Sequence, residues 1–200
     1  MKTIVYLVRH GRVENPDKIE YGRLPGFNLS QLGREQAAAI GQEILKAKID
    51  ICSIVSSPLE RAVQTSEIIS QAIGVPFKTD ERLTEWDQGP WEGKTTKEFA
   101  SQSGYYNVPM KMEGLEPHEE AAVRVLAVVK ELVDICAGKI VLIVSHRESM
   151  VSAVLKLQGK DYSLIHDLDM PVASVWELVF EGDQFISAAL KWDTPEMSKK

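Results

Sequence analysis

The sequence predicts an α/β fold, a three-layer sandwich in which helices flank a mainly parallel central sheet. Short apolar runs of strand length alternate along the chain with longer segments whose apolar residues recur at helical spacing. Near the C-terminus, two strand-like runs flank Glu181-Gly182-Asp183, which predicts a hairpin and an antiparallel edge. Because 200 residues without a repeat or a linker suit one domain, we expect a single domain over residues 1–200.

The first half of the chain alternates predicted strands and helices. In chain order these elements are expected as strand 3–8, helix 30–48, strand 51–55, helix 58–73 and strand 75–78. The first strand is a continuous run rich in β-branched residues, which is typical of a strand buried on both faces. Ser30 is expected to cap the first helix, and Ser57 followed by Pro58 to open the second. Gly74 marks the end of the second helix.

The second half begins with an irregular stretch. Residues 80–117 hold two Trp, two adjacent Tyr and three Pro, so we expect a cap-like segment at about 86–118 with one short helix near 95–103. The later elements are expected as helix 117–137, strand 139–144, helix 148–157 and strands 173–180 and 185–191. Gly138 is expected to end the long helix, and the last residues to form a frayed tail.

Composition and charge exclude several classes of protein. The formal net charge of −6 makes nucleic acid and anionic membranes poor partners. The longest apolar runs are far shorter than the roughly 20 residues of a membrane-spanning helix, and the N-terminal run is too short for a secretory signal. Cys52 and Cys136 favour buried free thiols in a reducing cytoplasm, with one disulfide as the alternative. The oligomeric state stays open, a homodimer being one alternative.

Histidines follow two of the predicted strands directly. His10 comes two residues after the first strand and His146 two residues after strand 139–144. Because parallel strands end at the same edge of a sheet, these side chains are expected to meet there. Arg61 lies one turn into the helix after the second strand and can reach the same edge. His and Arg side chains beside helix N-termini favour a phosphate pocket over a metal site, whose ligand spacing does not occur.

Five segments carry a resemblance to a known family. They are Leu7-Val8-Arg9-His10-Gly11; Gly22-Arg23 through Leu29-Ser30 with Gly33 and Gln36-Ala37; residues 56–65, Ser56-Ser57-Pro58-Leu59-Glu60-Arg61-Ala62-Val63-Gln64-Thr65; Arg82-Leu83-Thr84-Glu85 with Gly89 and Trp91-Glu92-Gly93; and Val144-Ser145-His146. Each segment alone is weak, but five in this order resemble the histidine phosphatase superfamily, also called the phosphoglycerate mutase-like family. The resemblance spans residues 4 to about 150 and implies that family's α/β sandwich.

The resemblance also implies a reaction and the residues that perform it. His10 would be the nucleophile that forms a phosphohistidine, and Arg9, Arg61 and His146 would surround the phosphoryl oxygens of the substrate. Glu85 would protonate the leaving oxygen and then activate the water that hydrolyses the intermediate. No metal and no other cofactor is implied, because positive side chains stabilise the charge. The expected partner is a small phosphorylated metabolite.

Several positions depart from the family's pattern. Asn15 is expected to supply the pocket amide at a shifted position, and Arg23 to contact the substrate or to lie on the surface. Arg147 stands where the family usually has Gly, so it could reach a second anionic group or point to solvent. The segment Glu113-Gly114-Leu115-Glu116 replaces a family stretch on the substrate side of the pocket.

Three functions compete at this point. A phosphatase is favoured over a phosphoglycerate mutase, because the family's mutases tend to be longer and differ around the acid. A non-catalytic phosphate-binding module is disfavoured by the intact set of predicted catalytic residues. His118 and His166 match none of the family segments and are expected at the surface or in loops. Trp86, Tyr105 and Tyr106 are expected to line the pocket mouth or to pack within the cap.

Overall fold

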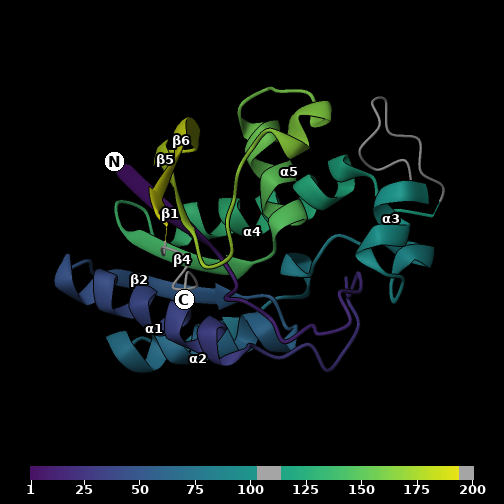
Figure 1. The fold of residues 1–200 in the computed structure, drawn as a ribbon. Coiled ribbons are helices and arrows are strands. Elements are labelled where there is room, and N and C mark those ends of the chain that lie inside the picture. Colours follow the sequence, from purple (N-terminus) through teal and green to yellow (C-terminus); the bar gives the residue numbers. More distant parts are fainter. Residues whose placement is uncertain (103–113, 194–200) are drawn as a thin grey trace.

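The computed structural model describes residues 1–102 and 114–193 and has the predicted architecture (Figure 1). Within these residues, a six-stranded sheet has the order β3-β2-β4-β1-β5-β6. Its strands are β1 (Lys2–Arg9), β2 (Ile51–Ser56), β3 (Phe77–Thr79), β4 (Ile140–Ser145), β5 (Val175–Glu181) and β6 (Gln184–Trp192). The first four are parallel, and the β5–β6 hairpin adds the antiparallel edge. The fold class is therefore confirmed.

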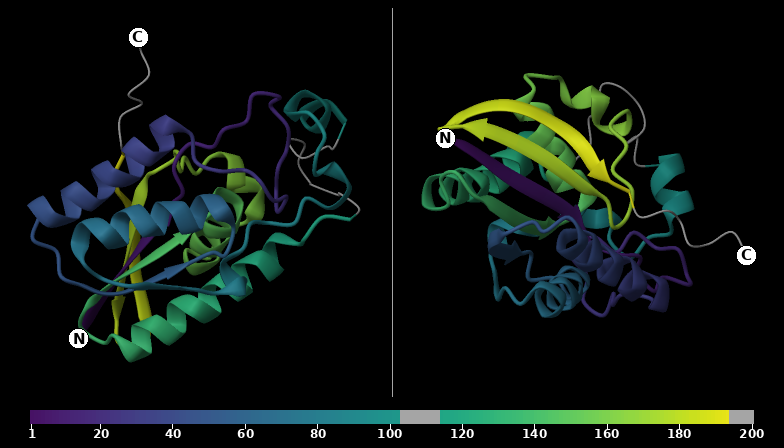
Figure 2. Two further views of the ribbon diagram at one scale, coloured as in Figure 1. Left: turned by 90° about the horizontal axis from the view of Figure 1, so that it is seen from below. Right: turned by 90° about the vertical axis from the view of Figure 1, so that its left-hand side faces the viewer.

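Helices cover both faces of the sheet. They are α1 (Gln31–Lys46), α2 (Glu60–Ile73), α3 (Thr96–Gln102), α4 (His118–Ile135) and α5 (Arg147–Leu157), with short 3₁₀ turns at 81–83, 89–91 and 162–166. Helices α1 and α2 lie on one face, and α4 and α5 on the other, as the views in Figures 1 and 2 show. Helix α3 lies apart from the sheet, beside the pocket described below (Figure 1).

Strand β1 is buried on both faces, as its uninterrupted apolar sequence predicts. Val5 and Leu7 pack into the core beneath α4 and α5, while Tyr6 and Val8 pack into the core beneath α1 and α2. Successive side chains of a strand point to opposite faces, so a strand between two helical layers needs apolar residues at every position. The same reasoning applies to β4, whose residues also divide between the two cores.

The register of the parallel strands brings three chain segments to one edge. Val8 of β1 and Ser56 of β2 both pair with Val144 of β4. The residues that follow these strands, His10, Ser57 and His146, therefore emerge at nearly the same level. This is the carboxyl edge at which open α/β sheets bind their ligands.

The expected start of the second helix is wrong. Helix α2 begins at Glu60 with Leu59 as its N-cap, and no side chain caps it. Ser57 instead lies in the loop before the helix, where its Oγ accepts a hydrogen bond from the backbone N–H of Leu59 at 3.3 Å. The same hydroxyl lies 2.7 Å from His146 Nε2, so the side chain of Ser57 is hydrogen-bonded to His146 and does not cap the helix. Ser30, by contrast, caps α1 as predicted.

Other boundaries differ by a few residues. Strand β3 covers Phe77–Thr79 rather than 75–78, and α5 begins at Arg147 with His146 as its N-cap. Much of the predicted cap-like segment, including Tyr105 and Tyr106, lies outside the described residues. Its described part forms a small separate cluster in which Trp86 and Phe99 pack with Ala121 of α4.

Cys52 of β2 and Cys136 at the end of α4 are free cysteines whose Sγ atoms lie 2.7 Å apart. Burial and the neighbouring Cys52 raise the pKa of the Cys136 thiol to about 11, so this thiol stays protonated. The interpretation as free thiols therefore fits the structure. None of the helices in the described part of the chain is long and apolar enough to cross a membrane. The homodimer and the cytoplasmic location stay predictions.

The first turn of α1 packs backbone against backbone on the loop that follows His10. A Cβ atom on Gly33 would collide with the carbonyl oxygen of Arg12. We expect Gly33→Ala to destabilise the fold by about 1–3 kcal/mol, although Ala normally stabilises a helix relative to Gly. Urea unfolding measures the change, with Glu35→Ala on the exposed side of α1 as the control. A Gly33→Ala protein as stable as the parent would show that this contact does not constrain the loop.

Candidate active site

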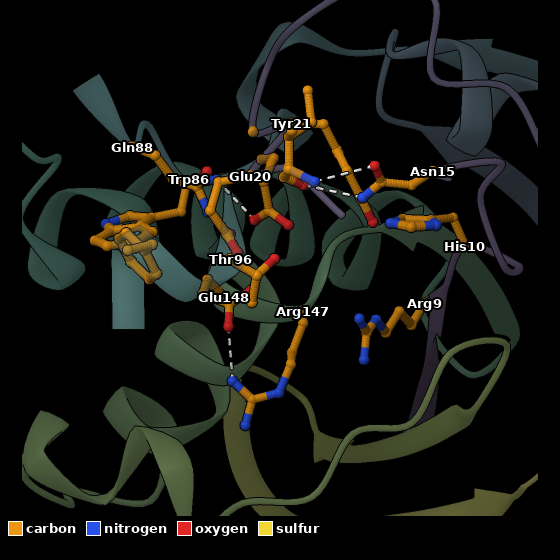
Figure 3. A pocket seen from close by; sticks show the side chains of 14 residues that line it. Arg9, His10, Asn15, Glu20, Tyr21, Trp86, Gln88, Thr96, Arg147 and Glu148 are labelled. Carbon is orange, nitrogen blue, oxygen red and sulfur yellow. Dashed lines mark hydrogen bonds and ion pairs between the residues drawn. The ribbon is translucent and has the colours of Figure 1, made fainter. Parts of the chain in front are cut away.

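Four of the predicted site residues, Arg9, His10, Asn15 and Glu85, line a pocket at the carboxyl edge of the sheet (Figure 3). Arg61 and His146 are fully buried next to His10. Arg9 and His10 lie on one side of the pocket, and Trp86 and Gln88 on the opposite side. The residues that line the pocket are Arg9, His10, Asn15, Ile19, Glu20, Tyr21, Gly22, Glu85, Trp86, Gln88, Thr96, Phe99, Arg147 and Glu148. They come from the end of β1, from the loop after β1, from Glu85 and the cap-like segment that follows it, and from the first turn of α5.

His10 is held in the protonation state that a nucleophile needs. Only 2% of its surface is exposed, and its Nδ1 lies 2.8 Å from the carbonyl oxygen of Gly11. A carbonyl oxygen only accepts, so Nδ1 carries the hydrogen and Nε2 keeps its lone pair. Burial, followed by the charges of Arg61 and Arg9, holds the pKa of His10 well below its ordinary value. The imidazole is therefore neutral at pH 7, and its Nε2 carries a lone pair that faces Arg61.

Arg61 is the central cation of the site and is fully buried. Its Nε–H is shared between His10 Nε2 at 3.3 Å and His146 Nδ1 at 3.2 Å. Its Nη2 donates to the carbonyl oxygen of Gly22 at 2.6 Å, and its guanidinium lies 4.7 Å from the ring centroid of Tyr21. Its Nη1 has no hydrogen-bond partner among the described residues. A buried cation with an unused donor is an arrangement suited to binding an anion.

His146 completes the inner end of the site. Its ring lies 5.1 Å from that of His10, measured between centroids. Because Nδ1 accepts from Arg61, the ring hydrogen is on Nε2 and is donated to Ser57 Oγ at 2.7 Å. Burial and Arg61 hold the pKa of His146 well below its ordinary value. The second histidine is thus neutral and fixed in one tautomer by its neighbours.

Arg9 supplies the second guanidinium of the site. Its Nη1 donates to the carbonyl oxygen of Met170 at 2.7 Å, which fixes the side chain beside His10 (Figure 3). Its Nε is buried and, like Nη1 of Arg61, lacks a partner among the described residues. The site therefore has two unused N–H donors on permanent cations next to the lone pair of His10.

Glu85 is a buried carboxyl group beside His146. Its Oε1 accepts from the backbone N–H of Trp86 at 2.7 Å and from Ser149 Oγ at 3.3 Å. Its Oε2 lies 4.0 Å from His146 Nδ1. Burial, followed by the charge of Glu148, raises the pKa of Glu85 to about 7 against the opposing effect of Arg61. The carboxyl can therefore give up or take up a proton near neutral pH.

The two weaker sequence candidates have partners within the protein. Asn15 lines the pocket, but its amide closes a loop by bonding both the N–H and the carbonyl oxygen of Ile19, at 3.1 and 2.9 Å. Arg23 donates to the carbonyl oxygen of Glu85 at 2.7 Å and pairs with Asp87 and Glu116 at 3.3 and 2.9 Å. Arg23 therefore supports the loop that carries Glu85. Substrate contacts by these two residues stay predictions.

Sequence reasoning did not single out Arg124 of α4, which holds the same loop. Its guanidinium donates to Glu116 at 2.6 Å. Its further acceptors are the carbonyl oxygens of Arg82, Thr84 and Glu85 and the hydroxyl of Ser149. The available signal was its spacing, since Arg124 lies three residues after buried Ala121 and four before buried Val128. An arginine beside the apolar stripe of a helix has a polar partner inside the fold.

His118 and Arg147 also have defined partners within the protein. The expectation of a surface or loop position for His118 is wrong: its ring is 9% exposed, stacks on Trp86 at 5.0 Å and lies 3.0 Å from Ser152 Oγ. Burial lowers the pKa of His118 to about 4. Arg147 borders the pocket, where Nη1 donates to Glu148 at 2.7 Å and Nη2 to the carbonyl oxygens of Ile165 and Leu168.

The donor set fits an anion rather than a metal ion. Across residues 1–102 and 114–193, no group of three or more His, Cys, Asp or Glu side chains is placed to hold a metal. Arg9 and His10 of the pocket, with Arg61 and His146 buried next to His10, instead combine two guanidinium groups with two neutral imidazoles, a combination that recognises phosphate.

Comparison with known proteins agrees with this geometry. Residues 5–193 match the sequence profile of the histidine phosphatase superfamily (branch 1). A Hydrogenobacter thermophilus protein named provisionally as a phosphoserine phosphatase is 32% identical over 188 residues, covering 90% of this chain and 91% of that protein. A Salmonella choleraesuis protein named provisionally as a phosphoglycerate mutase is 30% identical over 195 residues, covering 92% of this chain and 88% of that protein.

Solved structures show the same fold. A mycobacterial glucosyl-3-phosphoglycerate phosphatase superposes with a TM-score of 0.80 at 25% sequence identity, covering 95% of this chain and 97% of that chain. The profile match covers His10, His146 and the buried Arg61 between them. It also covers Glu85, the carboxyl group whose pKa is raised. The chain belongs to the histidine phosphatase superfamily, branch 1, and is an enzyme of this phosphatase and mutase-like kind.

Proposed function

We propose that the protein hydrolyses phosphomonoesters of small metabolites through a phosphohistidine on His10, without a metal ion. One observation carries the proposal. A neutral His10 directs its Nε2 toward buried Arg61 and lies beside half-buried Arg9, and each of these arginines has an N–H without a partner among the described residues. A phosphoryl group at this position would give both donors an acceptor and would place phosphorus next to the nucleophile.

The proposed binding step uses the positive charge of Arg9 and Arg61. Arg9 and Arg61 are permanent cations, and the two histidines between which Arg61 donates are neutral. A phosphate dianion would balance the two positive charges and accept their unused hydrogens. The same contacts would grow stronger as charge spreads over the phosphoryl oxygens in the transition state.

The proposed reaction has two steps. His10 Nε2 forms a bond to phosphorus while the bond from phosphorus to the ester oxygen breaks, and the leaving alkoxide takes the proton of Glu85. The alcohol then departs, and a water molecule enters. Its oxygen attacks phosphorus, the bond from phosphorus to His10 breaks, and Glu85 takes the proton of the water. Inorganic phosphate leaves and both side chains return to their first state.

The names of the relatives support a small phosphorylated substrate and leave the mutase as the second candidate. They include phosphoserine and glucosyl-3-phosphoglycerate phosphatases, and one relative is named provisionally as a phosphoglycerate mutase. The two functions separate in one assay, in which 3-phosphoglycerate is supplied with its bisphosphate primer. Release of inorganic phosphate without interconversion of the phosphoglycerates supports the phosphatase. Binding of phosphate without turnover of any phosphomonoester would favour a non-catalytic module.

His10→Ala removes the proposed nucleophile. We expect kcat/KM on an aryl phosphate to fall by roughly 10³-fold or more, because covalent transfer needs the imidazole nitrogen. Labelled phosphate that survives alkaline quenching on the parent protein should be absent from the variant. His166→Ala, at the end of the 162–166 turn, is the matched control and should retain the label. Label on the His10→Ala protein would place the nucleophile elsewhere.

Glu85→Gln tests the proposed acid. An alkoxide leaving group needs a proton in the transition state, whereas a nitrophenolate needs little help. We therefore expect a loss of about 10²–10⁴-fold in kcat/KM on an alkyl phosphate and a much smaller loss on p-nitrophenyl phosphate. Arg61→Ala is the comparison, since a group that contacts the phosphoryl oxygens should affect both substrates alike. Equal losses for Glu85→Gln on both substrates would contradict its role.

Removal of divalent ions tests the metal-free mechanism. Because positive side chains perform the charge stabilisation, we expect turnover in excess EDTA to equal that in untreated enzyme. Initial rates on p-nitrophenyl phosphate before and after dialysis against the chelator measure this. Activity that disappears and returns with one added divalent ion would overturn the metal-free proposal.

A further inference from the structure

A further carboxylate, Glu148, borders the same pocket as Glu85 and Glu20 and has no part in the reaction above (Figure 3). It lies in the first turn of α5, two residues after His146. Its neighbour Ser149 places its Oγ 3.3 Å from Oε1 of Glu85, so this turn of α5 packs directly on the acid. The side chain of Glu148 is 19% exposed. Two mostly buried carboxyl groups in one pocket need an explanation, because they repel each other when both are ionised.

The surroundings of Glu148 favour its ionised form. Arg147 donates to it at 2.7 Å, and this guanidinium is itself fixed by the carbonyl oxygens of Ile165 and Leu168. The first turn of α5 adds the partial positive charge of a helix N-terminus. Against burial, Arg147 and Arg9 hold the pKa of Glu148 below its ordinary value. Glu148 is therefore the permanent anion of the two.

The surroundings of Glu85 are more evenly balanced. The charged and titratable groups around it are Arg9 and His10 at the end of β1, Glu20, Tyr21 and Arg23 in the next loop, Arg61 of α2, Glu116 just before α4, Arg124 within α4, and His146, Arg147 and Glu148 at the start of α5. Both histidines are neutral, and Glu116 is paired with Arg23 and Arg124. The cations favour the ionised form of Glu85, while burial and Glu148 oppose it.

We propose that Glu148 is a positioning residue for the hydrolysis proposed above: it stays ionised, and its negative charge keeps Glu85 protonated, as the leaving group requires. The place of that proton follows from the contacts. Oε1 of Glu85 already accepts from the N–H of Trp86, so the proton lies on Oε2, the oxygen that faces His146. Two carboxyl groups whose environments push their protonation states apart divide into an acid and a fixed charge.

The direction of the expected effect follows from the raised pKa of Glu85. The acid form persists up to about pH 7 and is lost as pH rises through that value. Replacing Glu148 by a neutral group removes one cause of the raised pKa, so the loss should begin at lower pH. The cations Arg9 and Arg61 would then act on Glu85 with less opposition.

The experiment compares Glu148→Gln with the parent from pH 5 to 9 on an alkyl phosphate. We expect similar kcat at pH 5 and a loss of about ten-fold at pH 8, as for a pKa lowered by about one unit. On p-nitrophenyl phosphate the two proteins should differ little. Glu148→Asp keeps the charge and should restore the parent's profile. Glu67→Gln, an exposed position on α2, controls for the change in net charge.

A second measurement separates this inference from the proposed function. Carboxyl ¹³C NMR of the substrate-free protein titrates Glu85 directly, with Glu85→Gln assigning the signal. A lower midpoint in Glu148→Gln, with the parent's midpoint kept in Glu148→Asp, supports the inference even if no tested ester is hydrolysed. If phosphomonoesters are hydrolysed but the midpoint and the alkaline limb of kcat are the same in Glu148→Gln and the parent, the inference is overturned and the proposed phosphatase stands.

Discussion

The buried guanidinium of Arg61 is the interaction on which the rest of the site depends. It contacts His10 at the end of β1, His146 at the end of β4 and the carbonyl oxygen of Gly22 in the loop between them. A cation without solvent is costly to bury, and its donors need acceptors. Both imidazoles must therefore be neutral and turn a lone pair toward it. This requirement fixes the two tautomers and leaves the lone pair of His10 on Nε2, the nitrogen that we propose attacks phosphorus.

The contacts of Arg61 with His10 and His146 depend on the pairing of the parallel strands. The register that pairs Val8 and Ser56 with Val144 brings the ends of β1, β2 and β4 to one level, and α2 then returns Arg61 over that edge. A shift by one residue would also turn each apolar side chain to the wrong core. The hydrophobic packing of the two cores and the geometry of the site are thus set by the same pairing.

The sequence predicts the strands and most of the residues that lie at their carboxyl ends. An apolar run followed directly by a histidine predicts both a strand and a residue at its end, and both such predictions place His10 and His146 correctly. Arg61 followed from its distance to the second strand. These inferences need only local sequence and one general property of parallel sheets.

The remaining features depend on partners that are distant in sequence. Ser57 has the pattern of a helix cap, yet its hydroxyl serves His146, 89 residues away. The sequence around Arg124 predicts only a helical arginine, whereas in the fold its guanidinium donates to the carbonyl oxygen of Glu85. Arg23, from the loop after β1, donates to the same oxygen. His118 is buried because Trp86 stacks on it. Local propensity contains no information about such contacts, since they form only when the loops meet.

The proposed reaction needs positive charge to bind phosphate and a protonated carboxyl group to assist the leaving group, and these two needs conflict. Phosphate binding calls for cations, and cations beside Glu85 would ionise it and remove the proton that the leaving group needs. Arg61 contacts His10 and Arg9 lies beside it, whereas Glu148, paired with Arg147, borders the same pocket as Glu85, the proposed acid. Arg147 is thereby bound to Glu148 and two carbonyl oxygens, so the departure from glycine at this position supplies a counter-ion. An acid with a pKa of about 7 can coexist with two arginines because a fixed carboxylate offsets part of their field.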